Sequence, residues 1–194
     1  MALNDPDLRK ALLAHPLVKA LGPNTRVVPE MGLQQGRCRA DLAVVCENFL
    51  AGFELKGAND SLARLPVQVE LYSAVFDTCT LVAASKHLAK AVTLIPPWWG
   101  LVEATEVGTK VVLRQVRGHG VNPYTDAMTI CRLVWKDEVT ALLKAEGAFT
   151  GMAGANREVL YYRLLRVLGP VDTKTHVCRI LRTRTGWRGA YKGA

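Results

Sequence analysis

The stretch RCRADLAVVCENFLAGFELKGANDSLARLPVQVELYSAVFDTCTLVAA, residues 37–84, carries the strongest information about the fold of this chain. It opens with two apolar segments, 37–46 and 49–56, on either side of a short polar turn. Such a pair is typical of an antiparallel β-hairpin. A helical segment follows at 61–76, with Asp60 or Ser61 as its cap, and then a buried strand at 78–84. The stretch therefore predicts a strand–strand–helix–strand unit.

The segments on both sides of this unit extend the same architecture. The expected elements are a helix or two short helices at 3–21, a strand at 25–33, a helix at 85–95, and strands at 100–108 and 110–118. Pro16 argues for a break within the first helical segment. This order predicts an α/β fold, in which a mixed β-sheet is flanked by helices.

The pattern becomes purely helical after HGVNP (119–123), which resembles a linker. Helices are expected at 125–146, 156–169 and about 172–183, with a glycine-rich, flexible loop between the first two and a disordered tail at 185–194. We therefore predict two parts, an α/β domain at 1–120 and a helical, basic region at 121–194.

The positive charge is concentrated in the second part. The net charge of the chain is +8; residues 1–120 hold 13 basic and 11 acidic side chains, and residues 121–194 hold 12 and 6. No acid follows Asp172 in the sequence. This asymmetry favours a polyanionic partner, and the alternative is a solvated basic tail that keeps the protein in solution.

Several classes of protein do not fit the composition. No stretch reaches the length of about 18 apolar residues that a membrane span needs, and the polar N-terminus lacks the apolar core of a signal peptide. The five cysteines are scattered, without the close spacing of a zinc site or a disulfide framework. We therefore expect a cytoplasmic protein with no contact to a membrane.

Charged side chains in the apolar hairpin indicate the chemistry. Glu54 and Lys56 lie two residues apart and share one face of their strand. Hairpin pairing brings Asp41 near Glu54, and Glu30 ends the preceding strand as a third acid. Carboxylates that close repel one another unless a cation is present, and Mg²⁺ prefers such oxygen ligands. The alternative, a surface ion pair on an ordinary strand, fits poorly because both strands are so apolar.

A lysine beside such an ion has a specific use. It can assist an attacking water, or stabilise the extra negative charge on a phosphate under attack. The arrangement of Asp41, Glu54 and Lys56 therefore favours hydrolysis of phosphodiester bonds.

The same residues resemble a known superfamily. Asp41 followed by Glu54-Leu55-Lys56 is similar to the D…(D/E)xK signature of the PD-(D/E)XK nucleases, with Ala40 where the signature has proline. Gln68-Val-Glu-Leu-Tyr72 is similar to the QxxxY motif of their exonuclease-like and resolvase-like branch. The similarity covers about residues 25–100, and the whole chain resembles an uncharacterised group of small bacterial and phage proteins of this superfamily.

The resemblance implies a restriction-endonuclease-like core and a role for each matching residue. Asp41, Glu54 and the backbone carbonyl of Leu55 would bind Mg²⁺ or Mn²⁺. Lys56 would assist the attacking water, and Glu30 would be an auxiliary ligand or an acid beside the ligands. Gln68 and Tyr72 would orient Lys56 and contact the nucleic-acid backbone.

A second, weaker resemblance concerns residues 133–168, which are similar to SAP-type helix–extended loop–helix modules that bind DNA. Phosphates would then meet the basic side chains of this region, which are Arg157, Arg163, Arg166, Lys174, Arg179, Arg182 and Arg184. Near the hairpin, the corresponding candidates are Arg37, Arg39 and Arg64. The alternative is a helical hairpin that packs on the sheet.

The sequence thus predicts a metal-dependent deoxyribonuclease with DNA as its partner. It does not exclude RNA as a substrate, and it does not decide the oligomeric state, which could be a homodimer. The rival prediction is a non-catalytic nucleic-acid-binding or complex-assembly protein on the same fold. A third is a partner-binding protein that uses the Trp98–Trp99 pair and leucine-rich surfaces.

Overall fold

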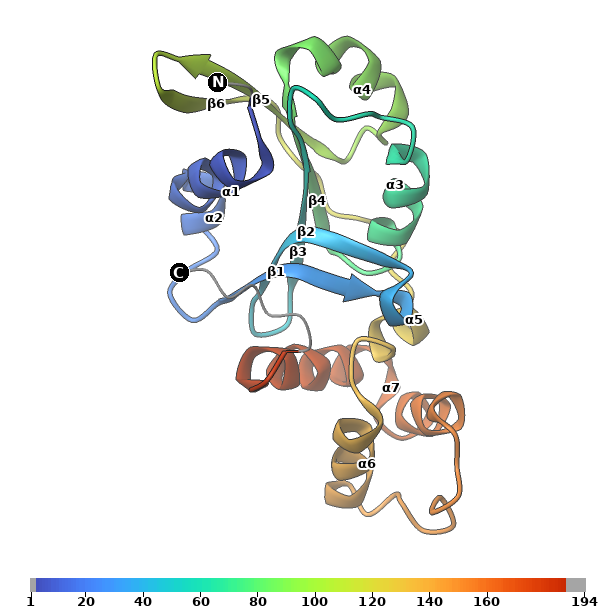
Figure 1. The fold of residues 1–194 in the computed structure, drawn as a ribbon. Coiled ribbons are helices and arrows are strands. Elements are labelled where there is room, and N and C mark those ends of the chain that lie inside the picture. The colour runs from blue at the N-terminus through green and yellow to red at the C-terminus, as the bar shows by residue number, and fades with distance from the viewer. Residues whose placement is uncertain (1–2, 188–194) are drawn as a thin grey trace.

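The computed structural model describes residues 3–187, and its centre is one six-stranded mixed sheet (Figure 1). The strands follow chain order across the sheet: β1 (Arg26–Leu33), β2 (Cys38–Val45), β3 (Leu50–Lys56), β4 (Thr78–Ala84), β5 (Gly100–Val107) and β6 (Lys110–Arg117). The pairs β3–β4 and β4–β5 are parallel, and the other three pairs are antiparallel. The predicted α/β fold with its 37–56 hairpin is confirmed.

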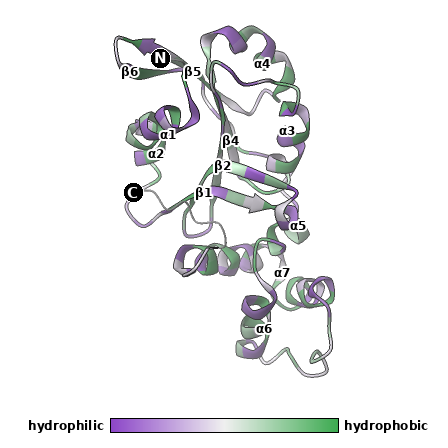
Figure 2. Cartoon of the chain, in the orientation of Figure 1, coloured by the Kyte–Doolittle hydropathy of each residue, from purple (hydrophilic) through white to green (hydrophobic). Residues whose placement is uncertain are grey.

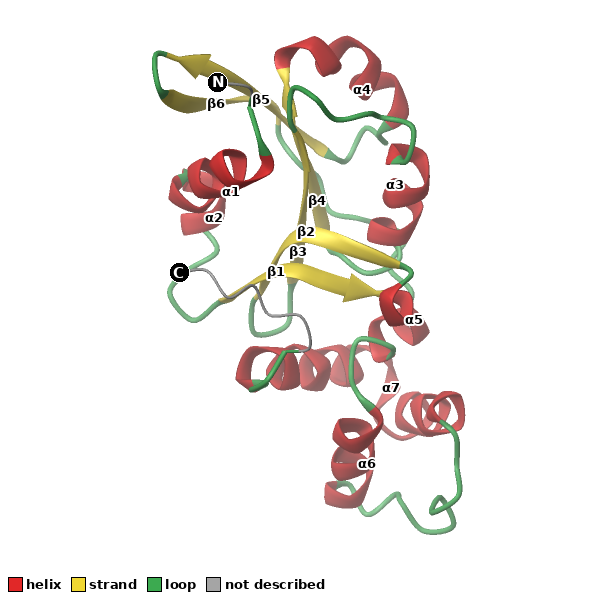
Figure 3. Cartoon of the chain, in the orientation of Figure 1, coloured by secondary structure: helices red, strands yellow, loops and turns green. Residues whose placement is uncertain are grey.

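Helices cover both faces of the sheet. Figure 3 shows α1 (Asp5–Ala14) and α2 (Pro16–Lys19) on one face, and α3 (Leu65–Ser73) and α4 (Leu88–Leu94) on the other. Each face buries its own apolar cluster; Phe53 and Leu55 belong to the cluster under α1, and Tyr72 and Phe76 to the opposite one. The helices present both polar and apolar residues, as amphipathic covering layers do (Figure 2).

The break predicted at Pro16 is present, because α1 ends at Ala14 and α2 begins at Pro16. The Asn4 side chain caps α1 by accepting a hydrogen bond from the Asp7 backbone N–H at 3.0 Å. The first helical segment therefore has the two-helix form.

The predicted start of α3 was wrong. The helix begins at Leu65 and not at 61, so Pro66 lies in its first turn, where a missing N–H costs nothing. Asp60 instead accepts from the Gly57 N–H at 2.6 Å, and Ser61 Oγ accepts from the Ala63 N–H. A 3₁₀ turn (Ser85–His87) likewise precedes α4, and Ser85 makes no capping hydrogen bond there.

Gly52 in β3 marks the tightest packing between the sheet and α3. A Cβ atom at this position would lie 2.4 Å from the Phe76 ring, which is fully buried. We expect Gly52→Ala to lower the free energy of unfolding by about 2 kcal/mol, because the ring has no free space to move into. Chemical denaturation measures the change. The matched control is Gly32→Ala in β1, where the new Cβ would meet no atom within 4 Å; a change there equal to that at Gly52 would contradict this explanation.

The C-terminal part consists of α5 (Ala127–Cys131), α6 (Lys136–Ala145) and α7 (Arg157–Thr183). The single helix predicted at 125–146 is two helices, and the two predicted at 156–183 are one element with a kink at Gly169 (φ 73°), followed by Pro170. Apolar residues of these helices join the cluster beneath α3. The hydrophobic core therefore continues across the boundary predicted at residue 120.

Two segments predicted as loose connections are held in place. The Asn122 side chain, 6% exposed, donates hydrogen bonds to the carbonyls of Ser73 and Phe76 and anchors the 119–123 segment. In the glycine-rich loop, Phe149 and Met152 pack against the core. Most of the tail predicted to be disordered, 188–194, lies outside the described residues.

Two further sequence predictions can be compared with the fold. Trp99 is completely buried, and the partly buried Trp98 packs against the same core, so this pair contributes little to a partner-binding surface. Among residues 3–187, no helix is long and apolar enough to cross a membrane.

Candidate active site

Glu54 and Lys56 form a buried ion pair at the end of β3. The Lys56 Nζ lies 2.6 Å from Glu54 Oε1, and the two residues are 4% and 0% exposed. Both side chains lie on the sheet face covered by α3, and Phe53 and Leu55 lie on the other, as the alternation predicted. A buried charge is costly without a partner, so each of these two side chains depends on the other for its charge to be tolerated inside the fold.

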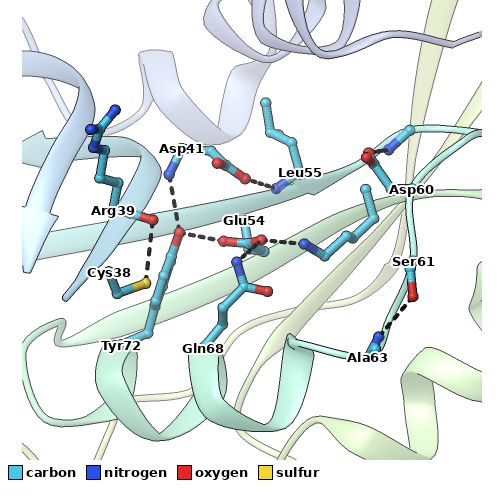
Figure 4. A network of polar contacts seen from close by, with 12 residues as sticks. Cys38, Arg39, Asp41, Glu54, Leu55, Asp60, Ser61, Ala63, Gln68 and Tyr72 are labelled. Atoms are coloured by element: carbon cyan, nitrogen blue, oxygen red, sulfur yellow. Dashed lines mark hydrogen bonds and ion pairs between the residues drawn. The ribbon is translucent and has the colours of Figure 1, made fainter.

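Helix α3 supplies the remaining partners of Glu54. Gln68 Nε2 donates to Glu54 Oε1 at 2.5 Å, and the Tyr72 hydroxyl donates to Oε2 at 2.6 Å (Figure 4). Gln68 and Tyr72 lie one helical turn apart and therefore reach the same point. Burial, and then the negative charge of Glu54, raise the Tyr72 pKa well above its ordinary value, so this hydroxyl keeps its proton.

One predicted role is corrected by these contacts. Gln68 and Tyr72 were expected to orient Lys56, but both bind Glu54, and Glu54 in turn holds the Lys56 amine. The lysine is positioned indirectly, through the carboxylate.

Asp41 lies beside this network. Leu42 pairs with Phe53, which places Asp41 opposite Glu54 one step further along the hairpin. Asp41 Oδ2 accepts from the Leu55 N–H at 2.7 Å, and its own N–H donates to the Tyr72 hydroxyl oxygen at 3.1 Å (Figure 4). Burial, followed by the charge of Glu54, raises the Asp41 pKa to about 8. Asp41 therefore holds a proton at neutral pH unless a cation approaches it.

Glu30 completes the acidic group, with an unforeseen partner. It lies between Pro29, which pairs with Leu42, and Met31, which pairs with Ala40, and it has a φ of 52°, uncommon for a residue with a side chain. Arg9, which is 8% exposed, donates to Glu30 Oε1 and to Asp5 Oδ2, each at 2.7 Å. Since Arg9 already binds its carboxylate, Glu30 fits the role of an acid beside the ligands better than that of a direct ligand.

Asp5 and Arg9 were not predicted as site residues, since the cap and the apolar spacing of the first helical segment indicate only a helix. Their separation of four residues, one helical turn, was the available signal. Burial raises the Asp5 pKa, and the charges of Glu30 and Asp60 act in the same direction. The N-terminal helix thus contributes two charged groups to the same end of the sheet.

The donor atoms of this cluster suit a hard divalent ion. Among the residues that the structure describes, no three or more His, Cys, Asp or Glu side chains are grouped closely enough to hold a metal by themselves. Mg²⁺, however, typically uses one or two carboxylates and keeps several waters. Asp41 and Glu54 carry such oxygens, although both Glu54 oxygens already accept hydrogen bonds and would have to share their remaining lone pairs.

Asp41 opens into a pocket of about 490 Å³ with basic walls. Arg37, Arg39 and Arg64 line it together with Glu30 and Gln68, so three of the predicted phosphate-binding side chains do meet at the acidic cluster. All three arginines are exposed. An anionic ligand entering this pocket would reach Asp41 directly, whereas Glu54 lies completely buried behind it.

The predicted phosphate-binding residues of the C-terminal part separate into two groups. Arg157, Arg163, Arg166 and Arg179 are exposed. The Lys174 amine instead pairs with Asp77, and the Arg182 guanidinium donates to the Asn24 carbonyl.

Arg184 is 6% exposed, and its guanidinium binds both oxygens of Glu138 and the Leu133 carbonyl. The hydrogen bonds of Arg184, like those of the Lys174 amine and the Arg182 guanidinium, join parts of the fold. Burial gives Arg184 a structural role, whereas for Lys174 and Arg182, which are partly exposed, contact with phosphate stays a prediction.

The fold and the cluster define an α/β protein with a buried acid–lysine network at one end of a mixed sheet. The family model of bacteriophage P4 protein cII matches residues 2–188, and the chain belongs to this family.

Protein cII of Enterobacteria phage P4 is 25% identical over 145 residues, which are 75% of this chain and 54% of that protein. The chain thus spans about half the length of the curated relative it matches. A solved structure, a protein of unknown function from Silicibacter pomeroyi, is 18% identical and covers 78% of this chain and 94% of its own, with a TM-score of 0.46.

Proposed function

We propose that this chain is a Mg²⁺- or Mn²⁺-dependent nuclease that hydrolyses phosphodiester bonds of DNA, of the PD-(D/E)XK type. The observation that carries the proposal is the position of Asp41, which joins the Glu54–Lys56 network to an arginine-lined pocket. An acid with a raised pKa next to a buried lysine is typical of functional sites. The free state of all five cysteines suits a reducing, cytoplasmic setting.

Each residue has a defined task in this proposal. Asp41, Glu54 and the Leu55 carbonyl would hold the divalent ion, which supplies activation of water and of the phosphate when bound. Lys56 stabilises negative charge that develops on the attacked phosphate. Gln68 and Tyr72 keep the Glu54 carboxylate in place, and Arg37 and Arg64 bind the flanking phosphates in the pocket.

The decisive variant is Asp41→Asn. The amide oxygen can still accept the hydrogen bond from the Leu55 N–H, so the substitution removes the charge and keeps the geometry. We expect cleavage of single-stranded, duplex and branched DNA in Mn²⁺ or Mg²⁺ to fall by at least about 100-fold. The matched control is Asp137→Asn, at an exposed position in α6, which should cut like the parent.

Gel-based cleavage assays with each metal, and with RNA as a parallel substrate, measure this effect. The proposal is overturned if the parent cuts none of these substrates, or if Asp41→Asn cuts as fast as the parent.

A second candidate function is supported by the saturation of Glu54. Its two oxygens accept hydrogen bonds from Lys56, Gln68 and Tyr72, as in a purely structural polar core. A non-catalytic nucleic-acid-binding or complex-assembly protein would keep this network closed. Salt-dependent DNA binding without hydrolysis in any metal would favour this second function.

A further inference from the structure

A groove connects the candidate active site with the C-terminal helices. Three adjoining pockets of about 490, 490 and 340 Å³ follow one another along the turn Gln34–Gly36 between β1 and β2. The pocket at Asp41 shares Arg37 with the middle one, and the middle one shares Gln35 and Arg132 with the last. The first and last pockets also share Gly36, so all three adjoin this one turn, and we refer to them together as the groove.

The walls of this groove combine basic and aromatic side chains. Arg37, Arg132 and Arg157 line it in succession, and Trp135 and Trp187 line its far end. The Arg184 guanidinium lies between the two indole rings, 4.2 Å from the Trp135 centroid and 4.5 Å from that of Trp187. The Arg184 guanidinium thus contacts both rings, and all three side chains line the pocket at this end.

The turn at the groove floor has an unusual backbone. Gln34, Gln35 and Gly36 have φ angles of 44°, 61° and 93°, a strained run for two residues with side chains. Gln35 accepts a hydrogen bond from Arg157 at 3.1 Å and donates to Glu158 at 3.4 Å. These two hydrogen bonds connect the β1–β2 turn to the first turn of α7.

We propose that this groove binds a single strand of nucleic acid and leads it to Asp41. Arginines spaced along a groove suit successive phosphates, and an aromatic face at its wall suits an unstacked base, which a single strand offers and a duplex does not. The inference deepens the proposed function and rests on it for the catalytic end of the groove. The binding itself requires no metal.

Two of the arginines are the best targets for a test. Arg132 binds both oxygens of Glu158, so its charge is partly neutralised. Arg37 and Arg157 are exposed at the middle and far parts of the groove. Two other exposed arginines, Arg163 and Arg166, lie on the same helix as Arg157 but line none of the three pockets. Replacing both removes the same charge as the test variant and therefore provides the control.

The experiment measures fluorescence anisotropy of a labelled 20-nucleotide DNA strand, titrated with protein in EDTA. We expect the double variant Arg37→Gln/Arg157→Gln to raise the Kd at least about 10-fold and to reduce the salt-dependence slope by about 1 to 2. Arg163→Gln/Arg166→Gln should change the Kd less than about threefold. Equal losses in the two double variants would overturn the groove and indicate general attraction by charge.

The aromatic contact is tested by Trp187→Leu. Loss of a stacked base is expected to weaken single-strand binding about 10-fold and to leave duplex binding unchanged. Equal weakening of both, or of neither, would overturn the single-strand assignment. Arg37→Gln/Arg157→Gln covers the case in which Trp187→Leu fails to fold.

Failure of the groove and failure of the nuclease are distinguishable. Asp41→Asn should bind the strand in EDTA as well as the parent does. Specific loss of binding in the groove variants, with no cleavage by the parent, supports the groove and removes the nuclease. If cleavage depends on Asp41 but the groove variants bind the strand as the parent does, the nuclease is supported and the groove is removed.

Discussion

Replacing Lys56 with methionine is expected to lower the free energy of unfolding by about 3–5 kcal/mol, because the Glu54 carboxylate would remain buried without its cation. Glu54→Gln should lower the free energy of unfolding by a similar amount, because it leaves the charged Lys56 amine, on a residue that is 4% exposed, without its carboxylate partner. Urea denaturation at pH 7, followed by circular dichroism, measures both changes.

The double variant Glu54→Gln/Lys56→Met is the control for this explanation. Removing both charges leaves no unpaired ion, so the double variant should lose clearly less stability than the two single variants added together. Additive losses would mean that the two side chains act independently, despite their separation of 2.6 Å. Because the single variants are destabilised, they test the structure of the site better than its activity.

Asp41→Asn is expected to raise the free energy of unfolding by about 3 kcal/mol at pH 8 in the absence of metal. The Asp41 pKa is about 8 in the folded protein and 3.8 without its surroundings. Each unit of this difference corresponds to about 1.4 kcal/mol, and we halve the total because the side chain keeps some contact with water. The variant thus becomes more stable at the position where the proposed function is lost.

The pH dependence has a defined sign. Below pH 3.8 the Asp41 carboxyl is protonated in both the folded and the unfolded protein, so the parent loses no stability relative to Asp41→Asn. Between 3.8 and about 8 the unfolded chain releases this proton and the folded one keeps it, so the parent loses stability relative to Asp41→Asn as the pH rises. Above about 8 the difference stays constant. Denaturation from pH 4 to 9 measures it, and a difference that shrinks with rising pH would contradict the burial of this charge.

Added Mn²⁺ provides the matching control. A divalent ion that binds at Asp41 stabilises the folded parent by mass action and should raise its melting temperature, whereas Asp41→Asn should respond little. Since the ion displaces the proton, its affinity for the parent should increase with pH up to about 8. An equal response of both proteins would place the ion elsewhere.

Much of this site was predictable from the spacing of residues alone. Glu54 and Lys56 share a face because strands alternate, and Gln68 and Tyr72 share one because helices turn every 3.6 residues. The hairpin turn at 47–48 then predicted that Asp41 lies near Glu54, which agrees with the pairing of the neighbouring residues Leu42 and Phe53. Each of these steps depends on local geometry, or on a single short-range pairing.

Other contacts depend on segments that are far apart in the sequence. Arg9 reaches Glu30 across 21 residues, and Lys174 reaches Asp77 across 97. The charge pattern of residues 157–184 could not separate Arg157, which lines the groove, from Arg184, which is buried and contacts two indole rings. The apparent basic tail was therefore partly structural.

The amino-acid order by itself was enough for the α/β class, the hairpin and the acid–lysine group, because backbone alternation and helical period act over a few residues. Only the packing of α1 and α7 against the sheet decided which charges are paired inside the fold and which face the groove. Burial and ion pairing depend on the neighbours that the whole chain brings together, and those neighbours are not encoded in any one stretch. The Glu54–Lys56 pair could thus be anticipated, while the groove from Asp41 to Trp187 could not.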